Sequence, residues 1–167
     1  MSQVDWSKFT HKIYLNAPIQ KVYNAWTTRA NLESWFLRKA EFTMPDGTVR
    51  ADTSPVQEGD TYAWLWHGHP DTTTEYGAVT DANGKDKFQF VFGKAGIVTV
   101  SLKQVDSNIT EMILTQDNIP TDEQGRFNYH VGCSTGWSFY EGNIKSVLEG
   151  GLDLRNKNPA YTNVINS

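Results

Sequence analysis

Two histidines that stand two positions apart, His67 and His69, form the most metal-like cluster of the sequence. Alternate residues of a strand point to the same side, and Asp71 and Glu75 follow as carboxylates that suit zinc. A structural zinc site needs four ligands, and no further Cys or His lies at a recognised spacing, with His130 able to join only if its segment folds back. The sequence therefore predicts no metal, and a solvated strand end is the simpler interpretation.

Two further residues have side chains that can move a proton or attack a carbonyl. His11 shares an apolar face with Ile13, where a hydrogen-bonded structural histidine is more common than a catalyst. Cys133 directly precedes an expected helix whose N-terminus could lower the thiol pKa, and His130 lies three residues earlier, but a buried inert thiol is the preferred interpretation. The sequence contains no glycine-rich phosphate loop, nucleophile elbow or paired-carboxylate motif. We therefore predict no catalytic residue and no cofactor.

Aromatic residues make up 13% of the chain and include six tryptophans. Tryptophan is rarely buried completely because its N–H needs a partner, and ligand pockets use aromatics with a few polar groups. Met112 and Leu114 are placed on the inward face of their strand because that choice keeps Glu111 in water. We expect a cavity lined by Trp35, Phe36, Trp64, Trp66, Phe88, Phe90, Phe92, Met112, Leu114, Trp137, Tyr140 and Ile144. The alternative is that these side chains fill a solid core.

The elements that must position these residues follow from the hydrophobic periodicity. Alternation predicts a first strand over 9–16, and Pro18 opens the first of two short helices whose apolar stripes end at Trp26 and Phe36. Short alternating runs between Lys39 and Gln116 predict an antiparallel meander, which brings the sheet to six or seven strands. We expect a surface loop over Asp117–Gly132, and then a long amphipathic helix over Ser134–Glu149 that Gly150 and Gly151 terminate. The fold class is α+β, with the helices on one face of a curled sheet.

Length and composition limit the classes of function. A chain of 167 residues is expected to form a single domain, with residues 151–167 as a tail. The formal charge of −4 and the pI near 5.5 argue against nucleic acid as a partner. No stretch is long and apolar enough to cross a bilayer, no basic leader followed by an apolar run opens the sequence, and the single cysteine cannot form an internal disulfide. We expect a cytoplasmic protein with no stable membrane insertion.

Three stretches of sequence resemble a known family. They are Ile13-x-Leu15-x-Ala17-Pro18 with the Ala25-Trp26 that follows, Leu32-x-x-Trp35-Phe36, and above all Gly136-Trp137 with Asn143-x-Lys145-x-x-Leu148-Glu149. Together they are similar to the bacterial relatives of the Hsp90 ATPase activator, the AHSA1-like family of the START-like (SRPBCC, Bet v 1-like) superfamily. The resemblance covers nearly the whole chain from Phe9 to Asp153 and implies a helix-grip fold.

The resemblance also implies a function. Members of the superfamily hold lipids, sterols, hormones or polyketides in a deep cavity between the sheet and the C-terminal helix. We therefore expect a small hydrophobic or amphipathic ligand as the partner, bound without chemistry. The alternatives are a module that modulates an Hsp90-type chaperone, and a cyclase or hydrolase that uses the same cavity. A homodimer is a further expectation, because Trp64 and Trp66 on one face of their strand and Ala63 and Leu65 on the other make both faces apolar.

Overall fold

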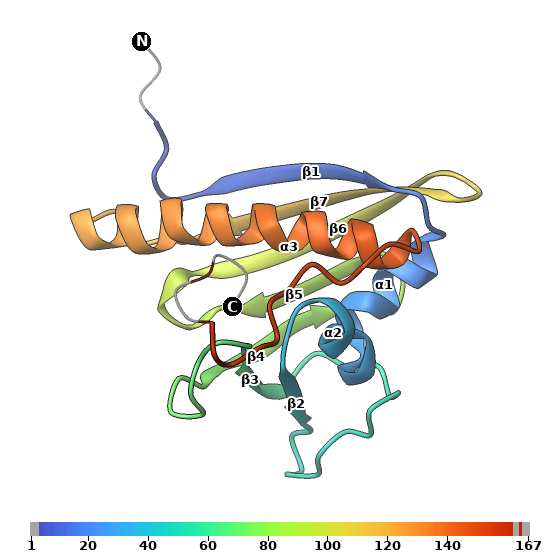
Figure 1. Ribbon diagram of the computed structural model, residues 1–167, viewed down its shortest axis with the longest axis horizontal. Helices are drawn as coiled ribbons and strands as arrows, with labels where there is room; N and C mark the ends of the chain where they lie inside the picture. Colours follow the sequence, from blue (N-terminus) through green and yellow to red (C-terminus); the bar gives the residue numbers. More distant parts are fainter. Residues whose placement is uncertain (1–3, 162–163, 165–167) are drawn as a thin grey trace.

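The computed structural model describes residues 4–161 and 164, and it contains one antiparallel sheet, two short helices and one long helix (Figure 1). In the described part of the chain the sheet has seven strands in the order β1-β7-β6-β5-β4-β3-β2. The elements are β1 (Phe9–Leu15), α1 (Ile19–Thr27), α2 (Arg29–Trp35), β2 (Lys39–Thr43), β3 (Thr61–Leu65), β4 (Glu75–Ala82), β5 (Lys87–Val91), the short 3₁₀ turn η1 (Gly93–Ala95), β6 (Ile97–Asp106), β7 (Ile109–Asp117), η2 (Gly125–Val131) and α3 (Gly132–Leu148). The expected α+β helix-grip architecture is confirmed.

The helices cover one face of the sheet. Figure 1 shows α3 crossing in front of the strands, while α1 and α2 lie together near one end of the same face. Every neighbouring pair of strands is antiparallel, and β1 returns to pair with β7 rather than with β2. The strands β2 and β1 are therefore the two edges of the sheet, and α3 packs along the edge that β1 forms.

Large aromatic side chains build the core between the helices and the sheet. The rings of Trp26 and Trp35 meet edge to face with 4.7 Å between centroids, and both side chains are fully buried. Trp35 Nε1 donates to the carbonyl of Ala25 at 2.9 Å, and Trp26 Nε1 donates to the sulfur of Met112 at 3.2 Å. Partners for these two N–H groups avoid the cost of an orphaned donor, whereas the Nε1 of the fully buried Trp64 has no partner among the described residues.

The inward face of β7 is the one expected from the sequence. Met112 and Leu114 are fully buried, whereas Glu111 lies on the opposite face and accepts a hydrogen bond from the hydroxyl of Tyr14 at 2.7 Å. Lys12 pairs with the same carboxylate at 3.3 Å. The prediction from the sequence is therefore correct about which side chains of β7 face the core.

The expected surface loop over Asp117–Gly132 is wrong over its second half. Gly125–Val131 forms η2, a π-helical segment that runs directly into α3, and the N–H of Gly132 donates to the carbonyl of Phe127 five residues earlier. Asp122 Oδ1 accepts the N–H of Gly125, the first residue of η2, at 2.6 Å. Phe127 and Val131 stand four residues apart, but both are exposed, so the segment buries no apolar stripe against the sheet. The helical rod consequently begins before Ser134.

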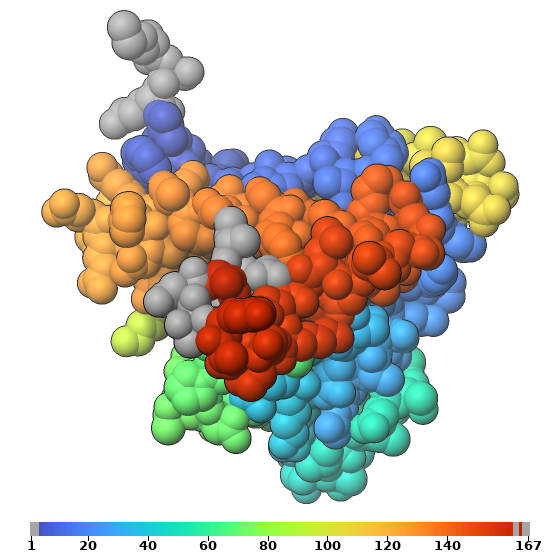
Figure 2. Space-filling model, viewed as in Figure 1, coloured from blue at the N-terminus to red at the C-terminus, as the bar shows by residue number. Residues whose placement is uncertain are grey.

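The segment after α3 folds back across the molecule. Gly150 adopts a φ of +85°, which ends the helix as the two glycines predict. The buried guanidinium of Arg155 then donates to the carbonyls of Leu37 at 3.0 Å and Glu33 at 2.9 Å, which ties the segment to the end of α2. Figure 2 shows this red-orange segment lying on the outside of the molecule, between α3 and α2.

Candidate functional site

A cavity of about 170 Å³ lies under the first half of α3. Three parts of the chain supply its aromatic walls: the end of α2, the ends of β3 and β5, and α3 itself. Its lining consists of Phe36, Trp66, Phe92, Asn128, Gly132, Cys133, Gly136, Trp137 and Tyr140. The helix contributes the small residues Gly132, Cys133 and Gly136 as well as the rings of Trp137 and Tyr140, so the helix backbone is left uncovered at its two glycines.

The structure divides the expected lining residues into two groups. Five of them line this cavity, namely Phe36, Trp66, Phe92, Trp137 and Tyr140. The other members, Trp35, Trp64, Phe88, Phe90, Met112, Leu114 and Ile144, are buried in the packed core outside the lining. Sequence reasoning overlooked Asn128, Gly132 and Gly136 as part of a site. The signal available for the two glycines was their spacing of four, which places both on one side of a helix.

Gly136 is the clearest sign that this space is open. A Cβ atom added at Gly136 would meet no atom within 4 Å, and one added at Gly132 would meet only the carbonyl oxygen of Phe127 at an ordinary 3.5 Å. Neither glycine is therefore required by close packing. A dry apolar cavity of roughly 150 Å³ holds a benzene molecule, whereas pockets for drug-sized ligands are about 300–1,000 Å³. The cavity suits a single ring or a short chain.

The polar groups around the cavity are held in their neutral forms. Burial raises the pKa of the Tyr140 hydroxyl to about 12 and raises the pKa of the Cys133 thiol as well. Cys133 gains nothing from a helix N-terminus, because η2 precedes it without a break. Trp137 Nε1 donates to Gln116 Oε1 at 2.8 Å. The described lining contains no Asp, Glu, His, Lys or Arg, so it offers apolar contact rather than acid–base chemistry.

Glu75 is a charged side chain near this region that does not belong to the lining. It stands at the start of β4, and its carboxylate lies against Gly93, where a Cβ atom would clash with it. Burial raises the pKa of Glu75, and the described residues give its carboxyl group no hydrogen bond or ion pair. Its charge in turn contributes to the raised pKa of Cys133. Within the described part of the chain, Glu75 is thus a half-buried carboxyl group without a partner.

His11 joins α3 to the edge strand β1. Its Nδ1 lies 2.9 Å from Glu141 Oε2 and its Nε2 lies 2.9 Å from Ser134 Oγ, so the histidine is hydrogen-bonded as expected. The connectivity is that of a Ser–His–acid triad. None of the three residues lines a described cavity, however, and Glu141 is buried with its Oε1 unpartnered among the described residues. The group holds the helix on the strand and has no described space beside it for a substrate.

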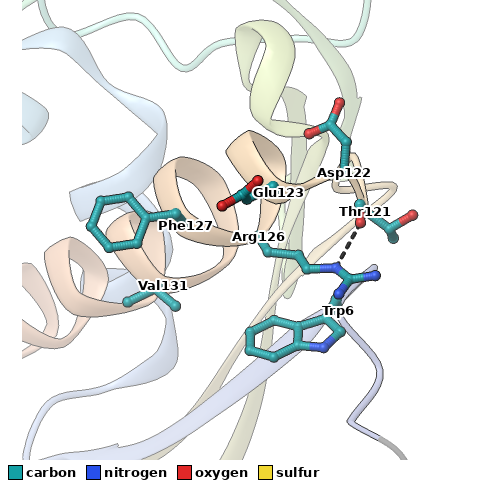
Figure 3. A pocket seen from close by; sticks show the side chains of 7 residues that line it. All are labelled: Trp6, Thr121, Asp122, Glu123, Arg126, Phe127 and Val131. Carbon is teal, nitrogen blue, oxygen red and sulfur yellow. Dashed lines mark hydrogen bonds between the residues drawn. The ribbon is translucent and has the colours of Figure 1, made fainter.

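A second hollow, of about 510 Å³, lies on the surface beside η2 (Figure 3). Figure 3 shows Arg126 extended beside the ring of Trp6, with its guanidinium carbon 5.8 Å from the ring centre. Phe127 and Val131 form the apolar part of this groove, and both are exposed. His130 lies 3.1 Å from the carbonyl of Trp6 through its Nδ1, so its described hydrogen bond is not to Cys133.

His67 and His69 line a third hollow, of about 580 Å³, together with Arg38 and Lys157. Within the part of the chain that the structure describes, no three Cys, His, Asp or Glu residues are grouped so that they could hold a metal ion. The same residues include no helix that is long and apolar enough to span a membrane.

Comparison with known proteins gives a consistent result. The family model described as "Activator of Hsp90 ATPase homolog 1-like protein" matches residues 16–149. No curated protein matches the sequence significantly.

Several solved structures share the fold. The solution structure of an Aha1 dimer from Colwellia psychrerythraea is 18% identical, with a TM-score of 0.66 over 86% of this chain and 97% of that one. An Hsp90 activator from Plasmodium falciparum is 19% identical, with a TM-score of 0.61 over 86% of this chain and 96% of that one. CalU16 from Micromonospora echinospora is 16% identical, with a TM-score of 0.62 over 88% and 77% of the two chains.

Proposed function

The chain belongs to the Activator of Hsp90 ATPase homolog 1-like family, and we propose that it binds a small apolar or amphipathic molecule in the cavity beneath α3. The observation that carries the proposal is the unfilled space opposite Gly136. Interiors are normally packed to the density of organic crystals, so an aromatic-lined gap beside a glycine is a place for a ligand. Because the described lining has no acid–base pair, the proposal is binding without chemistry.

The volume of the cavity limits the class of ligand. About 170 Å³ accommodates one aromatic ring or a short acyl chain, and it is too small for a whole sterol or polyketide. The rings of Phe36 and Trp137, 5.2 Å apart, offer flat surfaces for offset or edge-to-face contact. Asn128 is exposed and lies in the lining, so it gives an amide at which a polar end of the ligand can remain in water. We therefore favour a small amphipathic molecule with one ring.

The indole N–H signals of Trp66 and Trp137 in ¹H–¹⁵N NMR spectra report on the cavity directly, and Trp66→Phe and Trp137→Phe assign them. The probes are benzyl alcohol, 2-naphthol and cholate, which increase in size. We expect saturable shifts of both signals with benzyl alcohol and none with the two larger probes, 2-naphthol and cholate. No saturable shift with any probe would refute the proposal.

A matched pair of glycine variants tests the location of binding. Gly136→Leu fills the cavity, whereas Gly142→Leu adds the same side chain on an exposed position of the same helix, where a Cβ also meets nothing within 4 Å. We expect Gly136→Leu to weaken benzyl alcohol binding by about tenfold or more, because about 1.4 kcal/mol of lost contact has that effect. Gly142→Leu should leave the affinity unchanged. Equal affinities of the two variants would place the ligand elsewhere.

A second candidate function is modulation of an Hsp90-type ATPase. It is supported by the family description and by the surface groove in which Phe127 is 72% exposed. An exposed phenyl group beside Trp6 and Arg126 is the kind of side chain that anchors a protein interface. ATP turnover of an Hsp90-type protein should rise with added chain and should respond less to Phe127→Ser. Tyr76→Ser, at a residue 69% exposed on β4, is the control. An unchanged turnover with the wild-type chain excludes this candidate.

We also propose that the chain forms a homodimer, a proposal supported by its similarity to the Aha1 of Colwellia psychrerythraea, whose solution structure is that of a dimer. Light scattering at several protein concentrations measures the mass directly. A mass that stays at the 18.9 kDa of one chain at the highest concentration would refute the dimer.

A cytoplasmic location is a further proposal, in agreement with the absence of a spanning helix among the described residues. Fractionation of cells of the natural host, with an antibody against the chain, tests it. Recovery of the chain with the membrane pellet would contradict it.

A further inference from the structure

Three separate segments meet at the hollow beside His67 and His69, and two of them bring fixed positive charge. Arg38 follows α2, the two histidines belong to the loop between β3 and β4, and Lys157 comes from the segment after α3. Arg155, which is buried just behind, adds a third fixed positive charge that acts on His67. A fold that collects cations from distant parts of its sequence around one concave surface creates a local positive potential.

The carboxylates near this hollow cancel that potential only in part, because two of them face three cations. Arg38 Nη2 donates to Asp71 at 2.7 Å, but Asp71 is 80% exposed and its charge is screened by water. Asp153 pairs with Lys157 at 2.7 Å and with Arg155 at 2.7 Å, so one carboxylate is shared between two cations. The described residues give no hydrogen-bond partner to the imidazole of His67 or of His69. The imidazoles of His67 and His69 are therefore available to hydrogen-bond a ligand, and they lie close to positive charges.

We propose that this hollow binds the phosphate group of a soluble small molecule, held by Arg38, Lys157, His67 and His69. The inference is independent of the apolar cavity beneath α3 and goes beyond the binding function proposed for it. Arginine and lysine are the usual phosphate ligands in proteins, and a histidine that becomes protonated on binding adds a charged donor. The same cations repel a metal ion, so the two histidines suit an anion better than zinc.

The lowered pKa of His67 is consistent with a positive electrostatic potential in the hollow. Burial lowers the pKa of His67, and the charges of Arg155, Lys157 and Arg38 lower it further, while Asp153 acts in the opposite direction. Asp71 and His69 are the remaining titratable groups at the hollow. A phosphate dianion placed among these cations would reverse the balance and favour the protonated imidazole. Phosphate binding and proton uptake by His67 should therefore be coupled.

Histidine ring signals in ¹H–¹³C NMR spectra test the proposal with inorganic phosphate as the probe, at neutral pH and constant ionic strength. The chain has four histidines, and His67→Gln and His69→Gln assign the two that matter. We expect a saturable shift of both signals toward the protonated position as phosphate replaces chloride, with His11 and His130 unaffected. Shifts that are absent, or equal at all four histidines, would overturn the proposal.

A matched pair of lysine variants separates the hollow from general charge effects. Lys157 pairs with Asp153 at 2.7 Å and is 52% exposed, and Lys87 pairs with Asp81 at 2.8 Å and is 42% exposed, but Lys87 lies on β5 away from the hollow. Lys157→Gln should weaken phosphate binding by about threefold or more, and Lys87→Gln should leave it unchanged. Thermal melting verifies that each variant is folded. Equal affinities in the two variants would overturn the proposal.

The assignment to a soluble molecule rather than a lipid is tested with vesicles. Phosphatidic acid in phosphatidylcholine vesicles presents the same phosphate group on a surface. We expect no sedimentation of the chain with these vesicles. Sedimentation that Lys157→Gln abolishes would overturn the soluble ligand in favour of a lipid headgroup.

Discussion

The two halves of α3 are packed in different ways. In the second half, Asn143 and Ile144 are fully buried, and Glu141 and Lys145 bond to His11 and Tyr14 of β1. Glu149, at the C-cap, accepts the N–H of Asn16 just after β1. In the first half, Gly132 and Gly136 face a cavity. The first half is also tied, through Ser134 to His11 and through Trp137 to Gln116, but it omits side chains at its two glycines and so leaves space. A cavity persists only if the anchored half prevents the helix from collapsing into it.

Among the variants of the anchored half, replacement of Asn143 should reduce the free energy of unfolding the most. Its amide Nδ2 donates to the carbonyl of Trp35 at 2.6 Å and to Asp153 at 3.1 Å, and its Oδ1 accepts the N–H of Leu154 at 2.7 Å. Asn143→Ala removes these three hydrogen bonds and takes the amide donor away from the buried carbonyl of Trp35, so we expect a loss of about 3 kcal/mol in the free energy of unfolding. Urea denaturation followed by circular dichroism measures the loss.

Asn24→Ala is the control for this variant. Asn24 is also a helical asparagine, but its side chain accepts only the exposed amide of Gln20 at 2.9 Å. It should cost less than about 1 kcal/mol. Equal losses in the two variants would show that Asn143 is not an anchor.

Loss of the hydrogen bonds from His11 to Glu141 and Ser134 should have the next largest effect on stability. His11→Ala leaves the buried carboxylate of Glu141 without any described partner, because its second oxygen already has none. We expect a loss of about 2 kcal/mol in unfolding free energy. The double variant His11→Leu with Glu141→Leu removes the charge as well and should be less destabilised than the sum of its two single variants by about 1 kcal/mol. Additive losses in this double-mutant cycle would mean that the two side chains do not support each other.

Filling the cavity should stabilise the open half. A leucine in place of a helical glycine gains about 0.8 kcal/mol in helix propensity at either Gly136 or Gly142. At Gly136 the side chain also enters the cavity and is removed from water, which should add about 1 kcal/mol. The difference between Gly136→Leu and Gly142→Leu in urea denaturation measures that second contribution. A Gly136→Leu variant no more stable than Gly142→Leu would mean that the space is not available to a side chain.

Sequence periodicity predicted the helix and its end correctly in the anchored second half of α3. It did not predict where the helical rod begins, next to the open first half. The motif that runs from Gly136-Trp137 to Leu148-Glu149 lies on a regular amphipathic helix, and the Gly150 cap follows from left-handed geometry that glycine accepts. The π-helical start of the rod was missed because Phe127 and Val131 point to solvent and give no inward stripe. A tertiary contact, the hydrogen bond of His130 to Trp6, helps to hold that segment, and no local pattern reveals it.

The alternation of side chains along a strand also could not predict which inward residues line the cavity and which lie in the packed core. Phe88, Phe90 and Phe92 were assigned to one face by their spacing of two, and the rings of Phe90 and Phe92 do meet, with 6.0 Å between centroids. Only Phe92 lies in the cavity lining, because it follows the end of β5 while the other two sit under the helices. Period-two spacing shows which side of a sheet a residue faces, and it does not show how far that side is covered.

The smallest expected effect concerns Glu75, the half-buried carboxyl group beside the open half. Burial raises its pKa in the folded state, so the folded chain binds the proton more tightly than the unfolded chain does. Its contribution to stability is therefore present in acid and is lost as the pH rises from the unfolded pKa, about 4.3, through the higher folded value. Glu75→Gln should remove this pH dependence and stabilise the chain at neutral pH by a few tenths of a kcal/mol, since solvent screens a partly exposed group. Urea midpoints of both proteins across this pH range measure the difference. A variant that is less stable than the wild type at neutral pH would mean that Glu75 has a partner after all, and that the open half is anchored like the other.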